Sequence, residues 1–518
     1  MFNQVKRSLE DIAGEAYVKA LSKTAGLLHD FPEEEYLESA RERIDFLPDK
    51  YIKKVEDLTE NVGKQVVAPF LNENFGAATD GYNKATALCA APIGGVGCIR
   101  VGEDGRIYLA SKSEHYQISL GHNFPGYKLI DIARKLHIPN ATHNNTRGYI
   151  TRLMERKLIA DIYDTDDDTL NTILASREPK VLNRVISLQT GSLAVEAGIK
   201  MMLTNFYRLD NTFSQPKHFG KIPVFFVMSD NEGGLQANYH GTTVIAQTLR
   251  GMWPGYYKKL DEAGIYKVVS VKINDIDDFK EKMSRYNDGK YKTAGFLHEI
   301  ILMNYGGIRL TEEYLDEAYR VCREYNTPTL VDEIQSCMWY KGIYLFKQYR
   351  LKPDFVVVGK GFPGGEYSAS KIITTYEMDT LSQFGALVTN GQEELASLAY
   401  LITMDFVREN GEEIERLGAY LENELEAVKN KYPSLIIKIE GQAHCFAIHF
   451  DSADTAVSFT KILNSRCVDV STQTYKADCP PAALFKLPLI MTESIIKFLC
   501  GEMCEALNIM SNGEKING

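Results

Sequence analysis

Short apolar runs alternate with helix-patterned segments between residues 146 and 395. The runs include NRVISLQ, IPVFFVMSD, YKVVSVKI, PTLVDE, PDFVVVG and KIITT, and segments such as TGSLAVEAGIKMML and TEEYLDEAYRVCREY separate them. Strands that are apolar on both faces and separated by helices are typical of a mostly parallel sheet covered on both sides. We therefore predict a large α/β domain over 146–395 with a doubly wound sheet, whose ligand lies outside the carboxyl ends of the strands.

The flanking regions have different patterns. Residues 1–85 carry apolar positions at three- and four-residue spacing, as in SLEDIAGEAYVKALSKTAGLL and EEEYLESARERIDFL, and we expect a helical N-terminal extension there, of unknown role. Residues 86–145 contain two β-like runs around an Asp-Gly turn, which favours a hairpin. Residues 396–518 continue a long helix into the β-like SLIIKIEGQAHCFAIHF. We expect 86–145 and 396–518 to form one small α+β domain.

Composition and charge narrow the class of protein. The chain has 518 residues, 58 Lys+Arg, 69 Asp+Glu, a net charge of −11 and 44% hydrophobic residues, which are globular proportions and exclude a small disulfide- or metal-stapled scaffold. No dense basic block suits phosphate neutralisation, and no segment approaches the roughly 20 apolar residues that cross a bilayer. The nine cysteines are scattered without a metal-ligand pattern. We expect a cytoplasmic protein with a small-molecule partner, no bound metal, and neither nucleic acid nor a membrane as partner.

Two strand ends carry polar side chains. Asp332 follows the strand in TLVDEIQ, and Lys360 follows the strand in PDFVVVGKGFPGG. Taken singly, Asp332 is also an ordinary helix N-cap and Lys360 an ordinary lysine with its amine in solvent. A lysine between a buried strand and glycines can instead have its amine pKa depressed by desolvation and form a Schiff base.

Two more junctions add polar and aromatic groups. Thr190, Gly191 and Ser192 lie where a strand passes into a helix, whose free N–H groups can hold a phosphate. Tyr239 and His240 precede Gly241 in ANYHGTT, where an aromatic ring can stack on a flat ligand. Alone, the first motif is an N-cap and the second is core packing.

Together these groups meet the needs of pyridoxal phosphate. A lysine captures its aldehyde, a carboxylate keeps its ring nitrogen protonated, a helix N-terminus takes its phosphate and an aromatic side chain covers one face of its ring.

The chain resembles the class III, ω-amino acid type, aminotransferases of the fold type I pyridoxal-phosphate family, as a divergent member. The likeness runs from about residue 95 to 510 and is sharpest in TLVDEIQSCMWYKGIYLFKQYRLKPDFVVVGKGFPGG. GRIYLAS, LGHNFPGY with Gly121, His122 and Pro125, TGSLAVEAGIK, YHGTT and TNGQEELA resemble further family motifs.

The resemblance implies a role for each matching residue. Lys360 would form the Schiff base, and Asp332 would pair with the pyridinium nitrogen. The remaining cofactor contacts would come from Gln335 at the ring hydroxyl, Gly191 and Ser192 at the phosphate, Tyr239 against the ring, Glu299 as the first acid of a strand-end motif, and Thr389 from a partner subunit. The active unit would then be a homodimer.

The chain departs from the family pattern on the substrate side. Ile300 stands where the family has a proline, and Asn304 stands where it has a second glutamate. Leu484 stands where many relatives have an arginine for a substrate carboxylate, with Lys486 nearby. Arg147 and Arg309 are alternative cations, and each is also an ordinary structural arginine. These changes leave the substrate undefined.

We therefore expect an aminotransferase that moves an amino group between an amino acid or amine and a keto acid or aldehyde, with Lys360 as acid and base. Two alternatives stay open. The same cofactor serves decarboxylation, racemisation and aminomutase chemistry. A non-catalytic relative acting as a binding protein would also explain the changes at Asn304 and Leu484.

Overall fold

The computed structural model describes residues 1–29, 32–70, 76–85, 87–143, 146–389, 391–473 and 479–512. Within those residues, no helix combines the length and the apolar character that crossing a membrane requires.

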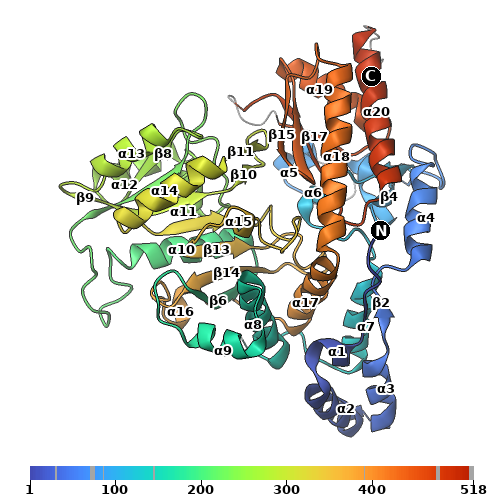
Figure 1. The fold of residues 1–518 in the computed structure, drawn as a ribbon, viewed down its shortest axis with the longest axis horizontal. Coiled ribbons are helices and arrows are strands. Elements are labelled where there is room, and N and C mark those ends of the chain that lie inside the picture. The colour runs from blue at the N-terminus through green and yellow to red at the C-terminus, as the bar shows by residue number, and fades with distance from the viewer. Residues whose placement is uncertain are drawn as a thin grey trace.

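A sheet of seven strands forms the centre of the large domain, in the order β6-β14-β13-β12-β9-β7-β8 (Figure 1). Its strands are β6 (Leu182–Leu188), β7 (Ile222–Met228), β8 (Lys267–Val271), β9 (Tyr291–His298), β12 (Thr329–Asp332), β13 (Phe355–Val358) and β14 (Ser370–Thr375). β14 is antiparallel to β13 and to β6, and the other neighbouring pairs are parallel. This confirms the mostly parallel sheet expected from the two-sided apolar runs.

Helices cover both faces of this sheet because alternate strand residues point to opposite sides. One face packs on α10 (Gly191–Leu203), α11 (Val244–Thr248) and α12 (Pro254–Glu262), with Phe225, Val357 and Ile372 in that core. The other face, with Phe226, Val356 and Ile373, packs on α8 (Tyr149–Tyr163), α13 (Ile276–Arg285), α14 (Glu312–Glu324) and α17 (Glu394–Glu409). Shorter helices are α9 (Asp167–Ala175), α15 (Leu345–Gln348) and α16 (Gln383–Ala386), and β10 (Ile301–Leu302) pairs with β11 (Ile308–Arg309).

Two smaller antiparallel sheets lie beside the large domain. One contains β15 (Lys438–Gln442), β16 (Cys445–His449), β18 (Ala482–Lys486) and β17 (Ser471–Thr472), and α18 (Gly411–Lys431), α19 (Ala453–Ser465) and α20 (Glu493–Ser511) pack against it (Figure 1). The other contains β3 (Pro92–Val96), β4 (Ile99–Gly102) and β5 (Ile107–Leu109), with the expected turn between β4 and β5. Leu109 pairs with Val468, so the segments before and after the large domain meet.

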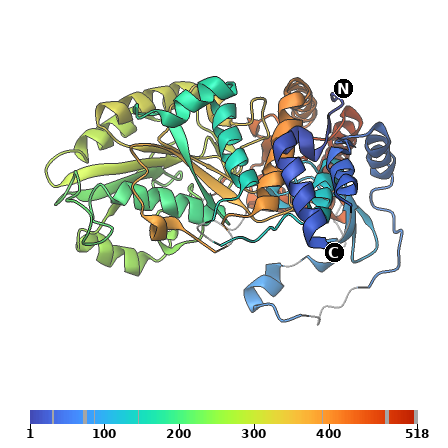
Figure 2. The same cartoon turned by 90° about the horizontal axis from the view of Figure 1, so that it is seen from below.

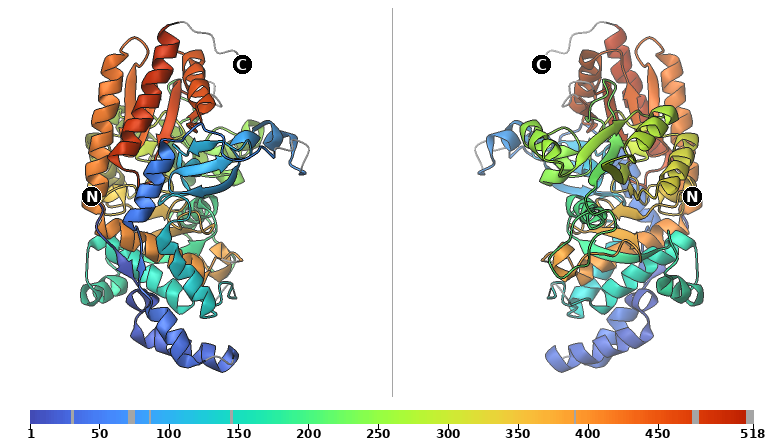
Figure 3. Two further views of the ribbon diagram at one scale, coloured as in Figure 1. Left: turned by 90° about the vertical axis from the view of Figure 1, so that its right-hand side faces the viewer. Right: turned by 90° about the vertical axis from the view of Figure 1, so that its left-hand side faces the viewer.

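The N-terminal region contains α1 (Leu9–Ala13), α2 (Glu15–His29), α3 (Glu33–Arg41) and α4 (Asp49–Thr59), followed by α5 (Asp80–Ala85). α2 and α3 lie at one end of the molecule and α20 at the other (Figure 3), while α5 lies apart from the body (Figure 2). The helical pattern read in EEEYLESARERIDFL ends early, at Arg41. There, β2 (Ile44–Asp45) pairs with β1 (Lys6–Arg7), a long-range contact that overrides local helix propensity.

Candidate active site

Asp332 and Lys360 lie at the same edge of the large sheet. Asp332 ends β12 and pairs in register with Val357 of β13, the strand that leads to Lys360. Lys360 itself has a φ of 47°, a left-handed conformation that is costly for a residue with a side chain. A Cβ on the next residue, Gly361, would lie 2.6 Å from the Trp339 ring, so the glycine permits the turn.

Asp332 is held in a fixed orientation. Its carboxylate is buried, its Oδ2 lies 3.0 Å from Nδ1 of His240, and its Oδ1 accepts a hydrogen bond of 3.1 Å from the backbone N–H of Ile334. A carboxylate with such partners stays in one rotamer, which is what an ion pair with a ring nitrogen requires.

Gln335 connects Lys360 to Glu299. Its Nε2 donates to Glu299 Oε1 at 2.8 Å, and its Oε1 lies 3.5 Å from Nζ of Lys360. Glu299 is buried just beyond β9. Burial, and then the charge of Lys486, lower the pKa of Lys360 to about 8, although Glu299 and Asp332 act in the opposite direction.

The N-terminus of α10 faces the same space. Thr190 is the N-cap, and Ser192 Oγ accepts a hydrogen bond of 2.9 Å from the N–H of Thr242. A Cβ on Gly191 would lie 2.2 Å from Cδ1 of Ile334, and one on Gly241 would lie 2.7 Å from Cα of Ser192. The backbone therefore approaches the cavity with no side chain in the way, as a phosphate cradle requires.

A cavity of about 240 Å³ joins these groups. Of the eight residues to which the resemblance gave a role, six line it: Gly191, Ser192, Tyr239, Asp332, Gln335 and Lys360. Glu299 lies behind Gln335 rather than at the wall, and Thr389 is exposed and away from this cavity.

Neither arginine suggested as an alternative cation lines the cavity. Arg147 is paired with Glu155, its Nε 3.0 Å from the carboxylate, and Arg309 is an exposed residue of β11. We therefore withdraw both as candidate carboxylate ligands within this chain.

On the small-domain side the cavity is lined by Gln117, which follows a turn that the sequence did not predict. Residues Ser113–Tyr116, labelled α6, have φ values of 47°, 48°, 58° and 74°, so they form a left-handed helical turn with no glycine. Such a turn costs roughly 1–2 kcal/mol per residue, and something must hold it. The next residue, Gln117, lines the cavity.

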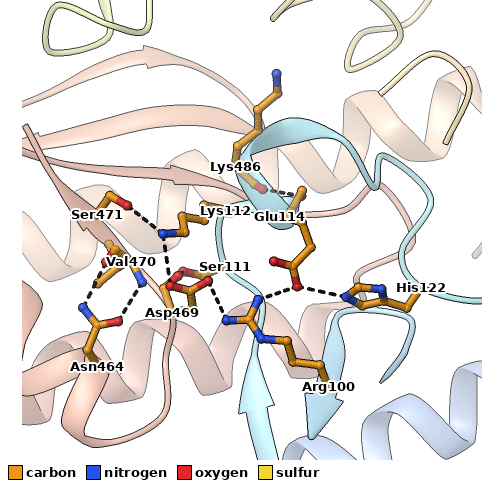
Figure 4. A network of polar contacts seen from close by, with 11 residues as sticks. Arg100, Ser111, Lys112, Glu114, His122, Asn464, Asp469, Val470, Ser471 and Lys486 are labelled. Carbon is orange, nitrogen blue, oxygen red and sulfur yellow. Dashed lines mark hydrogen bonds and ion pairs between the residues drawn. The ribbon is translucent and has the colours of Figure 1, made fainter. Parts of the chain in front are cut away.

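A network of charges holds this turn (Figure 4). Arg100 of β4, which is 3% exposed, pairs with Glu114 of the turn and with Asp469 at 2.9 Å, and His122 Nε2 lies 3.0 Å from Glu114. Burial favours a raised pKa for Glu114, but the hydrogen bond of His122 and the charge of Arg100 outweigh it and lower the pKa to about 2. His122 belongs to the Gly-His-x-x-Pro turn noted in the sequence. Its contact with Glu114 gives this histidine a structural role in the network.

The donors present fit pyridoxal phosphate. The cavity offers a lysine with a lowered pKa, an oriented carboxylate and a helix N-terminus free of obstructing side chains, and these are the groups that this cofactor needs. In architecture, the chain is a fold type I pyridoxal-phosphate enzyme.

Comparison with known proteins identifies the family. The model of the family "Aminotransferase class-III" matches residues 83–483, and the chain belongs to this family. It is 23% identical over 360 residues to the acetylornithine aminotransferase of Aquifex aeolicus, covering 68% of this chain and 83% of that one. It is 24% identical over 361 residues to an ornithine aminotransferase of Emericella nidulans, covering 68% and 71%.

Solved structures share the fold. The adenosylmethionine-8-amino-7-oxononanoate aminotransferase of Methanocaldococcus jannaschii superposes with a TM-score of 0.64 at 19% identity, over 88% of this chain and 99% of that one. A transaminase from the marine bacterium Virgibacillus gives a TM-score of 0.65 at 15% identity, over 89% and 100%. The protein is thus a pyridoxal-phosphate-dependent enzyme of amino-group transfer, as the sequence predicted.

Proposed function

We propose that Lys360 is the lysine that holds the aldehyde of pyridoxal phosphate and that Asp332 pairs with its ring nitrogen. The observation that supports this most directly is the convergence of three groups on one cavity: Lys360, Asp332 and the N-terminus of α10 with Gly191 and Ser192. These residues come from three separate strand ends and meet only in the folded chain.

Each residue has a task that its surroundings suit. Bound pyridoxal phosphate supplies an electron sink for the substrate carbon that loses a proton. Lys360 takes and returns that proton at Nζ, for which a pKa of about 8 is close to the working pH. Asp332, fixed by His240, stabilises positive charge at the ring nitrogen. Tyr239 lies at the cavity wall, where its ring can cover the cofactor, and Gln335 can reach the ring hydroxyl.

We further propose an amino acid or amine as donor and a keto acid or aldehyde as acceptor. The names of relatives, which are ornithine and acetylornithine aminotransferases, support an amino-acid substrate. At the position where many relatives carry an arginine for a substrate carboxylate, this chain has Leu484, so the donor need not be held in the same way. Exchange of labelled amine that depends on a keto acid would distinguish amino transfer from decarboxylation or racemisation on the same cofactor.

The active unit is proposed to be a cytoplasmic homodimer in which Thr389 of one subunit reaches the phosphate site of the other. Thr389 is exposed and lies outside its own cavity, which suits a residue that acts across an interface. The nine cysteines are thiols, which suits a reducing compartment. Sedimentation of the purified protein measures the oligomeric state, and a monomer with full activity would contradict the proposal.

An absorbance spectrum with pyridoxal phosphate tests the lysine assignment. Wild-type protein should show the absorbance band of an imine, and sodium borohydride should reduce that imine to a stable covalent link between the cofactor and Lys360. Lys360→Ala should show neither the band nor the link. Lys371→Ala is the matched control, because Lys371 is another buried lysine, with its pKa lowered to about 8, that does not line the cavity. An imine band that survives in Lys360→Ala and disappears in Lys371→Ala would overturn the assignment.

A further inference from the structure

Lys486 is a fully buried lysine at the junction of the two domains. It is the last residue of β18, and its exposed fraction is 0%. Along β18, Ala483 and Phe485 pack into the core of the small domain, while Leu484 belongs to the core shared with the large domain. Because strand side chains alternate, Lys486 points the same way as Leu484, toward the site.

The ammonium group of Lys486 is enclosed by aromatic rings. Its Nζ lies 3.9 Å from the centroid of the Trp339 ring and 4.6 Å from that of Tyr116, and it donates a hydrogen bond to the backbone carbonyl of Gln335. No carboxylate in the described part of the chain is ion-paired with it. The charged form is therefore stabilised by ring faces, a carbonyl dipole and a hydrogen bond with Cys445 rather than by an ion pair.

The ring of Tyr116 also lies close to the ammonium group of Lys360. Nζ of Lys360 lies 5.1 Å from the centroid of Tyr116, so one ring, presented by the left-handed turn, lies beside both ammonium groups. Like charges that share a poorly solvated space disfavour each other, and only Lys360 opens on the cavity where it can release its proton.

Backbone contacts keep Lys486 in place. Its N–H donates to the carbonyl of Ser111 at 2.9 Å, and the hydroxyl of Ser113 donates to its carbonyl (Figure 4). The indole N–H of Trp339 donates to the next carbonyl, that of Leu487, at 3.1 Å. The strained turn and the end of β18 are thus fastened together, with the ammonium of Lys486 directed away from the network around Glu114 (Figure 4).

We propose that Lys486 is a positioning residue whose fixed charge biases Lys360 toward its neutral amine, the form that attacks a carbonyl. This rests on the proposed function of Lys360. Lys486 acts through the shared environment of Tyr116, and it is not among the residues that line the cavity. A neutral amine at physiological pH removes the need to deprotonate Lys360 before each capture of the cofactor aldehyde.

Other charges and titratable groups also act on this pair. Burial lowers the pKa of Lys486 as well, and Cys445, Cys337 and Glu299 oppose that change by favouring its charged form. Asp332 and Glu299 favour the charged form of Lys360. The remaining titratable groups around the two lysines are His115, Cys337, His444 and Cys445. Burial and Lys486, in that order, lower the pKa of Lys360 despite the two carboxylates, which agrees with the direction proposed from the geometry.

The test is the titration of Lys360 in the protein without cofactor. A trace of acetic anhydride acetylates only neutral amines, so the yield on the Lys360 peptide, read by mass spectrometry across pH, gives the midpoint for that lysine. Lys486→Met and Lys486→Gln remove the charge, with methionine also suited to packing between aromatic rings. We expect the midpoint to rise by about one unit in both, so that the neutral fraction near neutral pH falls about tenfold.

Two controls separate charge from packing. Lys486→Arg keeps the charge and should leave the midpoint near that of the wild type. Lys371→Met removes a buried lysine that contacts Tyr400 instead, with its Nζ 5.3 Å from that ring, and should also leave it unchanged. Wild-type midpoints in whichever of Lys486→Met and Lys486→Gln is folded by circular dichroism would overturn the proposal. An equal shift in Lys486→Arg would also overturn it, since packing would then be the cause.

Failure of this inference is distinguishable from failure of the proposed function. Borohydride trapping in the wild type reports whether the cofactor is bound to Lys360. The acetylation midpoint, measured on the protein without cofactor, reports the charge of Lys360 even if Lys360 proves not to be the residue that holds the cofactor.

Discussion

The two walls of the cavity are built by different means. On the large-domain wall, Asp332, Lys360 and Gly191 take their places from where strands end and a helix begins, within a regular sheet. On the small-domain wall, Gln117 follows a left-handed turn, Ser113–Tyr116, that an ion pair with the buried Arg100 holds in place. On the first wall the backbone strain falls on Lys360 within otherwise regular strand ends, whereas the second stores strain over four consecutive residues, and ion pairs offset it. The difference shows that one part of the site follows from local strand and helix boundaries, whereas the other depends on charged residues brought together from distant segments.

The largest effect should come from the large-domain wall. Asp332→Asn keeps the shape of the side chain but removes the charge that stabilises a protonated ring nitrogen, so turnover should fall by roughly a hundredfold or more while the cofactor stays bound. Steady-state kinetics on protein of measured cofactor content provides the test. Asp354→Asn is the control, because Asp354 is a buried acid just before β13, at the opposite edge of the sheet. Wild-type turnover in Asp332→Asn would show that the carboxylate is not needed.

On the small-domain wall, Glu114→Gln should destabilise the fold by about 2 kcal/mol, since the buried Arg100 loses one of its two charged partners. The folded-state pKa of Glu114, about 2, lies below its ordinary value, so its stabilisation is complete above that ordinary value. The stability gap between wild type and variant should therefore close as pH falls from about 4.5 toward 2. Urea unfolding at several pH values measures the gap.

Glu317→Gln is the matched control for that experiment. Glu317 also has its pKa lowered to about 2, by hydrogen bonds from Arg320 and Lys280, but these two cations are 45% and 41% exposed whereas Arg100 is 3% exposed. Solvent screens such pairs, and this variant should show no measurable loss of stability. An equal loss in both variants would mean that the network around Arg100 has no special role.

A smaller effect is expected for Gly191→Ala. The added methyl group would lie 2.2 Å from Cδ1 of Ile334, and displacing that side chain into the cavity should weaken cofactor binding about tenfold. Fluorescence titration with pyridoxal phosphate measures the dissociation constant. Gly255→Ala, in α12 with nothing within 4 Å of the new methyl group, should bind as the wild type does. Equal binding by all three proteins would argue against the cradle at α10.

The smallest effect concerns the strain itself. His115 has a φ of 58°, so His115→Gly should relieve backbone strain. This gain should offset the larger conformational entropy that glycine loses on folding, and stability should change by less than about 1 kcal/mol. Gln117, two positions along, has an ordinary φ of −94°, and Gln117→Gly should lose about 0.5–1 kcal/mol. Thermal unfolding of both variants measures the contrast. A larger loss in His115→Gly than in Gln117→Gly would refute the left-handed turn.

The same contrast explains what the sequence could predict. The sheet, and the grouping of Gly191, Ser192, Tyr239, Asp332, Gln335 and Lys360 at one cavity, follow from apolar runs and from what comes directly after each run. These are local signals. The sequence marked Tyr-His-Gly as an aromatic loop but did not predict the contact of His240 with Asp332. Only the folded chain brings these two side chains together.

The small-domain wall could not be predicted in this way. Ser-Glu-His-Tyr contains no glycine or asparagine to signal positive φ, and the turn exists because Arg100 and His122 bind Glu114 from other segments. The position of Lys486 beside Gln335 and Trp339 likewise depends on how two domains pack. Thr389 stays a prediction, since its role requires a second subunit.

The enclosure of Lys486 has one more consequence, for the response to salt. Dissolved ions screen exposed charges over a Debye length of about 8 Å at physiological ionic strength, but they cannot surround an ammonium that has no contact with solvent. Surface pairs such as Arg320 with Glu317 weaken as salt is added, while the repulsion between Lys486 and Lys360 persists. The fraction of Lys360 in its neutral, reactive form is therefore set by the fold and not by the salt concentration around it.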